Sequence, residues 1–425
     1  MPNEQQRIRE IADQLHELGY PIVETEFRLP DNMRAQADVV AWASDDMGEL
    51  VPCLAIEIKR GQRPETALPQ LARVRSSLGT TEHYVVTDDG WFQAGQGLRT
   101  LQPVVGPPSA RGLPRGTLKS IKLATKMMSR RVWALSDRSR NRHSRSSTLD
   151  AFVEGTSGSA DGTQIQLTNG ELVTVDPDVL WHARRAVLTE LAERDSAVGP
   201  LVSPKAVSTA IGSLVGDRLN GKIVDPFCGS GSFLWSLQER AAREGCSTET
   251  VGRDIDPHVL RAASLIGQSA PRRVTFQQGD AFSEDLPEAD VIVTAPPMGL
   301  SLSHPYELAN GDRTKQVDVA AIDASLRALK PGGRAVFQLA PGITFQKATA
   351  SYRKYLANEY RVAALIGCPS GSVFASSIQS VLLVVDKMPA GETFVAQLAE
   401  DWETQLAPDG PVMLEALAYI DGKQV

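Results

Sequence analysis

The sequence predicts an α/β protein, with a mainly parallel sheet in its larger second part and a small α/β module before it. From about Leu201 onward, short apolar strand patterns alternate with helical patterns, which is typical of parallel sheets. In the first 105 residues, one amphipathic helical pattern is combined with several β-rich runs. A chain of 425 residues is also long for a single core, so two or three domains are expected.

Composition narrows the class of protein. The 42% hydrophobic content supports ordinary globular cores, and no apolar run is long enough to span a bilayer, so no membrane partner is expected. The first residues lack the basic and apolar segments of a secretory signal, and a cytoplasmic protein is therefore expected. Four scattered cysteines argue against a disulfide framework or a zinc knuckle. These are Cys53, Cys228, Cys246 and Cys368.

The first module is expected to begin with a helix and to continue with strands. Apolar residues recur at helical spacing up to Gly19, where the helix is expected to stop. They are Ile8, Ile11, Leu15 and Leu18. Three β-rich runs follow at 38–42, 54–59 and 83–87, and the turn-like residues 44–48 favour a hairpin between the first two.

This module carries a candidate metal site. In a strand, Glu57 and Lys59 point to one face, and a neighbouring strand beginning at Asp38 would place a second carboxylate beside them. Two carboxylates can hold a divalent metal such as Mg²⁺, and a nearby ammonium can activate water for phosphodiester cleavage. The alternative is a structural ion pair on an edge strand.

These residues resemble a known family. Asp38, Glu57-x-Lys59 and Gln70 are similar to the PD-(D/E)xK nuclease fold, and most similar to the N-terminal domain of type I restriction subunits. The resemblance implies Asp38 and Glu57 as metal ligands, with Lys59 and Gln70 as further catalytic residues. Ala37 departs from the family pattern, which has proline before the aspartate.

A basic segment lies between residues 111 and 145, where Asp137 is the only acid. Its cations are Arg111, Arg115, Lys119, Lys122, Lys126, Arg130, Arg131, Arg138, Arg140, Arg142 and Arg145. In a chain of net charge −7, such a segment is an electrostatic footprint for a DNA backbone. Proline and glycine at 107–116 equally favour a solvated linker.

Residues 150–200 are expected to form a bridge. Two short β patterns flank Asn169-Gly170, which favours a hairpin. Asp176 is expected to cap a helix that begins at Pro177. Its core-facing residues are expected to be Trp181, Leu188 and Leu191.

The second part opens with a glycine turn. A short apolar strand at 223–224 runs into Asp225-Pro226-Phe227-Cys228-Gly229-Ser230-Gly231, and a helix is expected from Ser232 to Arg243. Gly229 and Gly231 let a ligand approach the main chain at a helix N-terminus. Asp254 ends the next strand at the spacing of a ribose ligand, while Asp256 is expected to cap the following helix. Asp280 is expected near the adenine of such a ligand.

The stretch from Asp225 to Phe233 resembles the cofactor motif of N-6 adenine DNA methyltransferases of the type I modification-subunit kind. Other segments share the resemblance: Val202–Lys205, Leu329–Arg334, Cys368–Phe374 and Ser380–Val385. The resemblance implies a Rossmann-like class I domain that binds S-adenosylmethionine. The cofactor ligands that it implies are Pro204, Lys205, Asp225, Phe227, Gly229, Gly231, Asp254 and Asp280.

The loop that would hold the target base departs from this family. The family loop has Asn or Asp, then Pro-Pro, then an aromatic residue, whereas this chain has Ala295-Pro296-Pro297-Met298. Ala295 offers no side-chain acceptor to the amine of a flipped-out adenine. Met298 can pack on a ring, although less rigidly than an aromatic residue. Adenine methylation is therefore expected to be severely weakened.

The expected division is a nuclease-like domain at 1–105, a basic linker at 106–150, a hairpin–helix bridge at 151–200, a methylase-like domain at 201–388 and a C-terminal tail at 389–425. The tail is too short for a target-recognition domain, so a separate specificity or restriction subunit is expected to read the DNA sequence. The alternative is that the protein binds DNA through the phosphate backbone only. Three hypotheses remain open. They are an adenine methyltransferase of a restriction-modification or phage-defence system, a pseudo-methylase that regulates or positions the nuclease-like domain, and an interaction module with both sites inactive.

Overall fold

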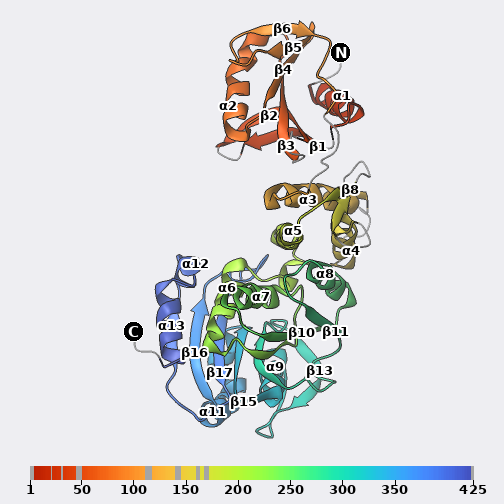
Figure 1. Cartoon of the computed structure of the whole chain (residues 1–425). Helices are drawn as coiled ribbons and strands as arrows, with labels where there is room; N and C mark the ends of the chain where they lie inside the picture. The colour runs from red at the N-terminus through yellow and green to blue at the C-terminus, as the bar shows by residue number, and fades with distance from the viewer. Residues whose placement is uncertain are drawn as a thin grey trace. The chain divides into compact units, whose positions relative to one another are not determined.

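The computed structural model of the chain describes residues 4–20, 22–29, 32–44, 50–110, 117–138, 145–158, 163–166 and 172–422. The chain forms two compact units (Figure 1). The N-terminal unit comprises residues 1–131 and 156–180, and the C-terminal unit comprises residues 132–155 and 181–425. Both units therefore draw on the stretch that the sequence analysis assigns to a linker and a bridge.

The N-terminal unit contains a six-stranded sheet whose strands follow the order of the chain. The strands are β1 (Ile22–Leu29), β2 (Asn32–Ser44), β3 (Leu50–Ile58), β4 (Glu82–Thr87), β5 (Gly90–Ala94) and β6 (Leu101–Val104). β1, β2 and β3 form an antiparallel meander, β4 runs parallel to β3, and β5 and β6 continue antiparallel. The helices are α1 (Glu4–Glu17), the short 3₁₀ helix η1 (Pro64–Ala67) and α2 (Leu68–Leu78).

The predicted first helix is confirmed. Ile8, Ile11 and Leu15 of α1 are buried, and Gly19 has a φ of 89° just after the helix. The three predicted strands are β2, β3 and β4, and the antiparallel pairing of β2 with β3 confirms the hairpin, whose turn lies outside the described residues. β1, β5 and β6 were not predicted. The sequence of β1 does not alternate strictly between apolar and polar residues, and its buried residues include Glu24 as well as apolar side chains.

The bridge is divided between the units. In the N-terminal unit, β7 (Gln164–Gln166) pairs antiparallel with β8 (Leu172–Thr174), as predicted, although Asn169-Gly170 lies outside the described residues. α3 (Ile121–Arg138) and α5 (Pro177–Arg194) each contribute residues to both units. Asp176 caps α5 as predicted, because its Oδ1 accepts hydrogen bonds from the backbone N–H groups of Asp178 and Val179 at 3.0 and 3.4 Å. The predicted core residues of α5 are buried: Trp181, Leu188 and Leu191.

The C-terminal unit is built on an eight-stranded sheet in the order β11-β10-β9-β12-β15-β17-β16-β18. The strands are β9 (Gly221–Asp225), β10 (Thr248–Asp254), β11 (Val274–Gln278), β12 (Ala289–Thr294), β15 (Leu329–Leu339), β16 (Arg361–Cys368), β17 (Ser380–Asp386) and β18 (Phe394–Gln397). All paired strands are parallel except β17, which runs antiparallel to both of its neighbours. The prediction of a mainly parallel sheet is confirmed.

Helices cover both faces of this sheet (Figure 1). The helices of this unit include α4 (Arg145–Thr156), α6 (Lys205–Leu214), α7 (Ser232–Glu244), α8 (Pro257–Gly267), α9 (Val317–Ala328), α10 (Gly342–Phe345), α11 (Ala350–Glu359), α12 (Trp402–Gln405) and α13 (Pro411–Ile420). A hairpin of β13 (Ser301–Glu307) and β14 (Arg313–Gln316) precedes α9. The short 3₁₀ helices are η2 (Gly199–Leu201), η3 (Gly216–Arg218) and η4 (Lys347–Thr349).

Residues of the central strand β12 enter two separate apolar clusters. Val291 and Val293 belong to one cluster, and Ala289 and Ile292 belong to the other. Successive side chains of a strand point to opposite faces, so β12 is buried on both faces, as expected of a central parallel strand. No helix in the described part of the chain is both long and apolar enough to cross a bilayer.

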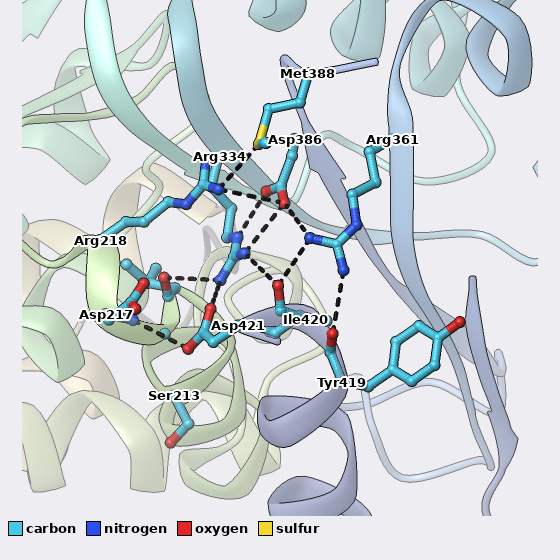
Figure 2. Close-up of polar contacts among 12 residues, drawn as sticks. Ser213, Asp217, Arg218, Arg334, Arg361, Asp386, Met388, Tyr419, Ile420 and Asp421 are labelled. Atoms are coloured by element: carbon cyan, nitrogen blue, oxygen red, sulfur yellow. Dashed lines mark hydrogen bonds and ion pairs between the residues drawn. The ribbon is translucent and has the colours of Figure 1, made fainter. Parts of the chain in front are cut away.

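The segment expected to be a C-terminal tail is part of this unit. It adds β18 to the sheet beside β16 and ends in α13. Figure 2 shows Arg334 between Asp386 and Asp421, with Arg361 on the other side of Asp386. Arg334 donates to Asp386 at 2.7 and 3.1 Å and to Asp421 at 2.7 Å, and its side chain is fully buried. This network ties the end of α13 to β15 and β17.

Candidate functional site: a crevice at the carboxyl ends of β9 to β12

The glycine turn lies at the point where the strand order reverses. β9 and β12 are neighbours in the sheet, and the chain runs from β9 outward to β10 and β11 before it returns to β12. Ligands of open α/β sheets bind at the carboxyl ends of the strands at such a point. The turn therefore occupies the expected place of a ligand crevice.

Both glycines of the turn have left-handed backbone angles. Gly229 has a φ of 51° and Gly231 a φ of 84°. A Cβ at position 229 would lie 2.8 Å from the carbonyl oxygen of Leu201, and one at 231 would lie 2.8 Å from the ring of Trp235. The turn needs glycine at both positions for backbone angle and for space. α7 begins directly afterwards and ends at Gly245, which confirms the predicted helix.

Asp225 is held inside the turn. Its carboxylate is 1% exposed, and Oδ1 accepts hydrogen bonds from the backbone N–H of Phe227 at 3.1 Å and the hydroxyl of Thr294 at 2.8 Å. Burial raises the pKa of Asp225 to about 7, and these hydrogen bonds oppose the increase. Asp225 therefore shapes the turn from within and joins it to the end of β12.

Asp254 reaches the same turn from β10. Its Oδ2 accepts from the backbone N–H of Gly229, and its Oδ1 from that of Asp256, both at 2.9 Å. Burial raises the pKa of Asp254, and the two backbone donors oppose this. Asp256 accepts from the backbone N–H of His258 at 2.9 Å, which confirms its predicted role as the cap of α8.

Asp280 follows β11 at the same edge. It accepts from the backbone N–H of Phe282 at 2.9 Å and from the hydroxyl of Ser283 at 2.8 Å. A carboxylate has about four acceptor positions, so Asp254 and Asp280 each keep positions for ligand hydroxyl or amino groups. The structure brings Asp225, Asp254 and Asp280 to one edge of the sheet, as the spacing predicts.

Apolar side chains flank these acids. Two of them, Ile255 and Phe282, were not predicted as site residues. Ile255, directly after Asp254, is 65% exposed. The rings of Phe227 and Phe282 lie 5.3 Å apart between centroids. An apolar residue directly after the acid that ends a strand is the signal that could have identified Ile255. Carboxylates that can accept hydrogen bonds from hydroxyl and amino groups lie beside exposed apolar surface, and this combination fits an adenosine group.

The segment before the turn packs against it. The backbone N–H of Ser230 donates to the carbonyl of Leu201 at 3.0 Å, and that of Ser203 donates to the hydroxyl of Ser232 at 3.1 Å. Pro204 is buried at the start of α6, while Lys205 is exposed in its first turn. The structure thus places the predicted residues Pro204 and Lys205 next to the glycine turn.

The Pro-Pro loop begins where β12 ends, beside β9. Ala295 is half-buried and packs against an apolar cluster, Pro296 is buried, Pro297 is exposed and Met298 is half-buried. Thr294 is fully buried and its hydroxyl donates inward to Asp225. Thr294 therefore does not replace the acceptor that Ala295 lacks.

The candidate site of the N-terminal unit is assembled by β2 and β3. The register pairs Val39 with Ile56, which places Asp38 opposite Glu57. Glu57 is fully buried, its Oε2 lies 3.2 Å from Lys59 Nζ, and its Oε1 has no hydrogen-bond partner. Burial raises the pKa of Glu57 to about 7, the charge of Asp38 adds to the increase, and Lys59 opposes it.

Two further observations describe this site. Asp38 Oδ2 accepts from the backbone N–H of Ile58 at 2.6 Å, and Gln70 is half-buried in the first turn of α2. No group of three or more His, Cys, Asp or Glu that could hold a metal occurs in the described part of the chain. The protein thus offers two carboxylates there, one of which has a buried oxygen without a partner.

Part of the basic segment is used for internal contacts. Lys126 forms an ion pair with Glu24 at 2.5 Å and lies over the ring of Phe27. Arg130 donates to the carbonyl of Val23 at 2.6 Å, and Arg131 donates to two backbone carbonyls. Lys119 and Lys122 are exposed, and Arg145 donates to the carbonyl of Ala197. Arg111, Arg115, Arg140 and Arg142 lie outside the described residues, as does the side chain of Arg138.

One solved structure supports the fold. The chain is similar to a protein from Listeria monocytogenes described as a class I S-adenosylmethionine-dependent methyltransferase, with 14% identity and a TM-score of 0.55, over 70% of this chain and 99% of that one. It also matches a type I restriction-modification methyltransferase subunit from Streptococcus thermophilus, with 17% identity and a TM-score of 0.49. That match covers 59% of this chain and 58% of the subunit.

A family comparison matches the part of the chain that contains the glycine turn and the Pro-Pro loop. The family described as N-6 DNA Methylase matches residues 175–405, which is more than half of the chain. The matched range contains the glycine turn, the three acids and the Pro-Pro loop. It extends to α12, in keeping with a C-terminal segment that is part of the unit. The chain belongs to the N-6 DNA methylase family.

Proposed function

We propose that the C-terminal unit binds S-adenosylmethionine and DNA as part of a restriction-modification or phage-defence system, and that Ala295 weakens its transfer of a methyl group to N-6 of adenine. The observation that carries the proposal is the contact between Thr294 and Asp225, because it holds the Pro-Pro loop against the glycine turn. A loop that presents a base and a turn that holds a cofactor need to be neighbours for transfer between them.

Different residues at this edge of the sheet would bind different parts of S-adenosylmethionine. Asp254 would accept from ribose hydroxyls and Asp280 from the adenine amine, with Ile255 and Phe282 against the adenine ring. Pro204 and Lys205 would close the methionine end, next to the turn formed by Gly229 and Gly231. S-adenosylmethionine would supply the electrophilic methyl group in this crevice.

The loop would hold the target adenine. The half-buried Met298 would pack on a base that is taken out of the duplex. A polar side chain at position 295 would accept a hydrogen bond from the amine and raise the electron density on its nitrogen, and alanine removes that partner. The loss of one positioned electrostatic partner costs about two to three orders of magnitude in rate.

The alternative is a pseudo-methylase, in which the same crevice binds S-adenosylmethionine as a ligand and regulates or positions the N-terminal unit. Ala295 is compatible with either function. The two differ in whether a restored acceptor restores transfer, because a pseudo-methylase lacks further parts of the catalytic site.

The test restores the acceptor. Ala295→Asn is compared with Ala295→Val, which adds volume without an acceptor, and with the unchanged protein. The measurement is tritiated methyl incorporation into unmethylated plasmid DNA of mixed sequence, with calorimetry of S-adenosylmethionine in parallel. We expect an increase of about 100-fold for Ala295→Asn alone. Cofactor binding without any gain would leave the pseudo-methylase, and no binding at millimolar cofactor would leave an interaction module.

A second candidate function is a metal-dependent nuclease in the N-terminal unit. Its support is the pair Asp38 and Glu57 on adjacent strands, with Lys59 beside Glu57 and a buried Glu57 oxygen that lacks a partner. These carboxylates would hold Mg²⁺, which would supply a Lewis acid for phosphodiester hydrolysis. The candidate residues lie on β2, β3 and α2, in a unit whose elements follow the order α1, β1, β2, β3, α2 and β4.

A plasmid nicking assay with and without Mg²⁺ tests this second function. Glu57→Ala and Lys59→Ala should abolish any cleavage, whereas Glu65→Ala, a change of an exposed acid in η1, should retain it. Cleavage that survives Glu57→Ala would come from elsewhere, and the two carboxylates would then form a structural pair with Lys59.

A further inference from the structure

A separate pocket lies beyond the Pro-Pro loop. It has a volume of about 230 Å³ and is lined by three segments that are distant in the sequence. These are Gly299–Ser301 after the loop, Gln316–Val319 at the start of α9, and residues of the stretch from Ala340 to Gln346 after β15. None of the lining residues belongs to the glycine turn or to its three acids.

The size of the pocket restricts what it can hold. Drug-sized ligands and cofactors occupy pockets of about 300–1,000 Å³. A space of about 230 Å³ is smaller than this range, yet it exceeds the roughly 30 Å³ that one water molecule takes. The pocket therefore fits a fragment such as one heterocyclic ring.

The polar groups of the pocket favour a ligand that donates hydrogen bonds. Asp318 is half-buried in the first turn of α9 and lines the pocket, and the backbone of Ala340 favours its charged form. Gln316 Nε2 donates to Gln346 Oε1 at 2.9 Å, which leaves the other end of each amide for a ligand. Burial raises the pKa of Asp318 to about 6, so the group is mainly a carboxylate at neutral pH.

An anion is a poor occupant. A helix N-terminus attracts phosphate or carboxylate ligands, but at α9 the side chain of Asp318 already supplies the negative charge. A second anion there would meet like charge at short range. The ligand is therefore neutral or cationic at the atoms that face Asp318.

The pocket also has apolar surface on which a flat ring can stack. Val317, Val319 and Ile343 line it and are buried. Leu300, which also lines the pocket, is 61% exposed. Phe345, the last residue of α10 and the residue before the lining residue Gln346, is 70% exposed. Exposed apolar side chains of this size are used by DNA-binding proteins to stack on unpaired bases or to insert between them.

We propose that this pocket holds one unstacked nucleobase with an exocyclic amine, adenine or cytosine, next to the base presented to the Pro-Pro loop. Asp318 accepts a hydrogen bond from the amine, and Leu300 contacts the ring. The site lies one segment beyond Met298 and selects the nucleotide that flanks the target. The inference rests on the proposed binding of DNA by this unit, and it is independent of whether methyl transfer occurs.

The experiment measures binding of the full-length protein to single-stranded 15-nucleotide oligothymidylates with one central dA, dC or dT. S-adenosylhomocysteine is present at saturation, so that adenine does not enter the cofactor crevice. Fluorescence anisotropy is expected to give about tenfold tighter binding of the dA and dC oligonucleotides, as expected for one hydrogen bond to a charged group.

Two variants separate the pocket from general DNA binding. Asp318→Ala should reduce the preference to less than about twofold, and Asp318→Asn, which keeps one acceptor oxygen, should retain part of it. Asp178→Ala is the matched control, because Asp178 is an exposed acid in the first turn of another helix, α5. That control should retain the whole preference.

The outcomes are distinct. A preference that is lost in Asp318→Ala and kept in Asp178→Ala supports the pocket, even if Ala295→Asn gives no methyl transfer. Equal binding of the three oligonucleotides, or an unchanged preference in Asp318→Ala, overturns it while leaving the proposed DNA binding intact. The absence of detectable binding to all three overturns both.

Discussion

The hydroxyl of Thr294 donates a hydrogen bond of 2.8 Å to Asp225 Oδ1 in the buried interior of the C-terminal unit. The two residues are the last of β12 and the last of β9, which lie side by side in the sheet. This bond links the residue before the Pro-Pro loop to a carboxylate in the glycine turn. The bond therefore couples the loop to the turn.

The raised pKa of Asp225 predicts a pH dependence of stability. Because the folded protein holds this proton more tightly than the unfolded chain does, the stabilisation is complete below pH about 4 and is lost as the pH rises through about 7. Asp225→Asn cannot ionise. We expect its free energy of unfolding, relative to the unchanged protein, to improve by about 1–3 kcal/mol between pH 5 and pH 8. Urea denaturation followed by circular dichroism measures the difference.

Asp290→Asn is the control, because the pKa of Asp290 is shifted in the opposite direction to that of Asp225. The pKa of Asp290 is lowered by the backbone N–H of Lys222 and by Lys330, so its stabilisation is present above its unfolded pKa and is lost only as the pH falls through the lower folded value. The effect of Asp290→Asn on the free energy of unfolding should be the same at pH 5 and at pH 8. A pH-independent effect of Asp225→Asn as well would contradict the assignment of a raised pKa to Asp225.

The glycine turn should tolerate no side chain at position 231. Gly231→Ala combines a left-handed backbone angle with a Cβ that would lie 2.8 Å from the ring of Trp235, and should lower the free energy of unfolding by about 2–4 kcal/mol. Gly245→Ala has a similar φ of 70°, yet its Cβ would meet nothing within 4 Å. Gly245→Ala, the control, should therefore lower the free energy of unfolding by only about 1–2 kcal/mol. Equal losses would show that space at Trp235 is unimportant.

The buried network around Arg334 should be necessary for the fold. Arg334→Met leaves Asp386 and Asp421 without their main partner, and breaking a buried pair costs about 3–5 kcal/mol. Arg313→Met is the matched control, since the pair of Arg313 with Glu307 is exposed and such pairs contribute about 0–1 kcal/mol. Hydrogen exchange should show the greatest loss of protection in α13. Unchanged protection there would mean that apolar packing alone holds the helix.

The exposed part of the basic segment should contribute to DNA affinity through charge. The double variant Lys119→Ala/Lys122→Ala should reduce the slope of log Kobs against log salt by about 2, if both lysines lie at phosphates. Lys126→Met should instead destabilise the N-terminal unit and leave the slope unchanged, because Lys126 already pairs with Glu24. Binding titrations at four salt concentrations give both slopes. An unchanged slope in the double variant would indicate a solvated linker.

The sequence predicted the part of the crevice that depends on local pattern. A glycine turn after an apolar strand, and an acid at the end of the next strand, are recognisable because a parallel sheet brings such positions to one edge. The partners of Asp225 were not recognisable, since Thr294 lies 69 positions away. The pocket beside Asp318 was missed for the same reason, because three distant segments form it.

The positive charge of the basic segment did not predict which of its side chains make internal contacts. Lys126 and Arg130 belong to a run that resembles a DNA footprint, but burial against Glu24 and Val23 decides their role, and burial depends on tertiary packing. β1 was missed because Glu24 interrupts its apolar pattern, and that residue is the partner of Lys126. The half-buried ion pair of Lys126 with Glu24 is thus linked to one error in secondary structure and one in the expected surface charge.

β18 also has a consequence for solubility. It pairs with Ala364–Gly367 of β16, whose side chains are largely apolar, and it covers the backbone of a strand that would otherwise form the edge of the sheet. Exposed apolar edges invite pairing with a second chain. A truncation before Phe394 would uncover this edge, so the last 32 residues protect the protein against aggregation as much as they complete its fold.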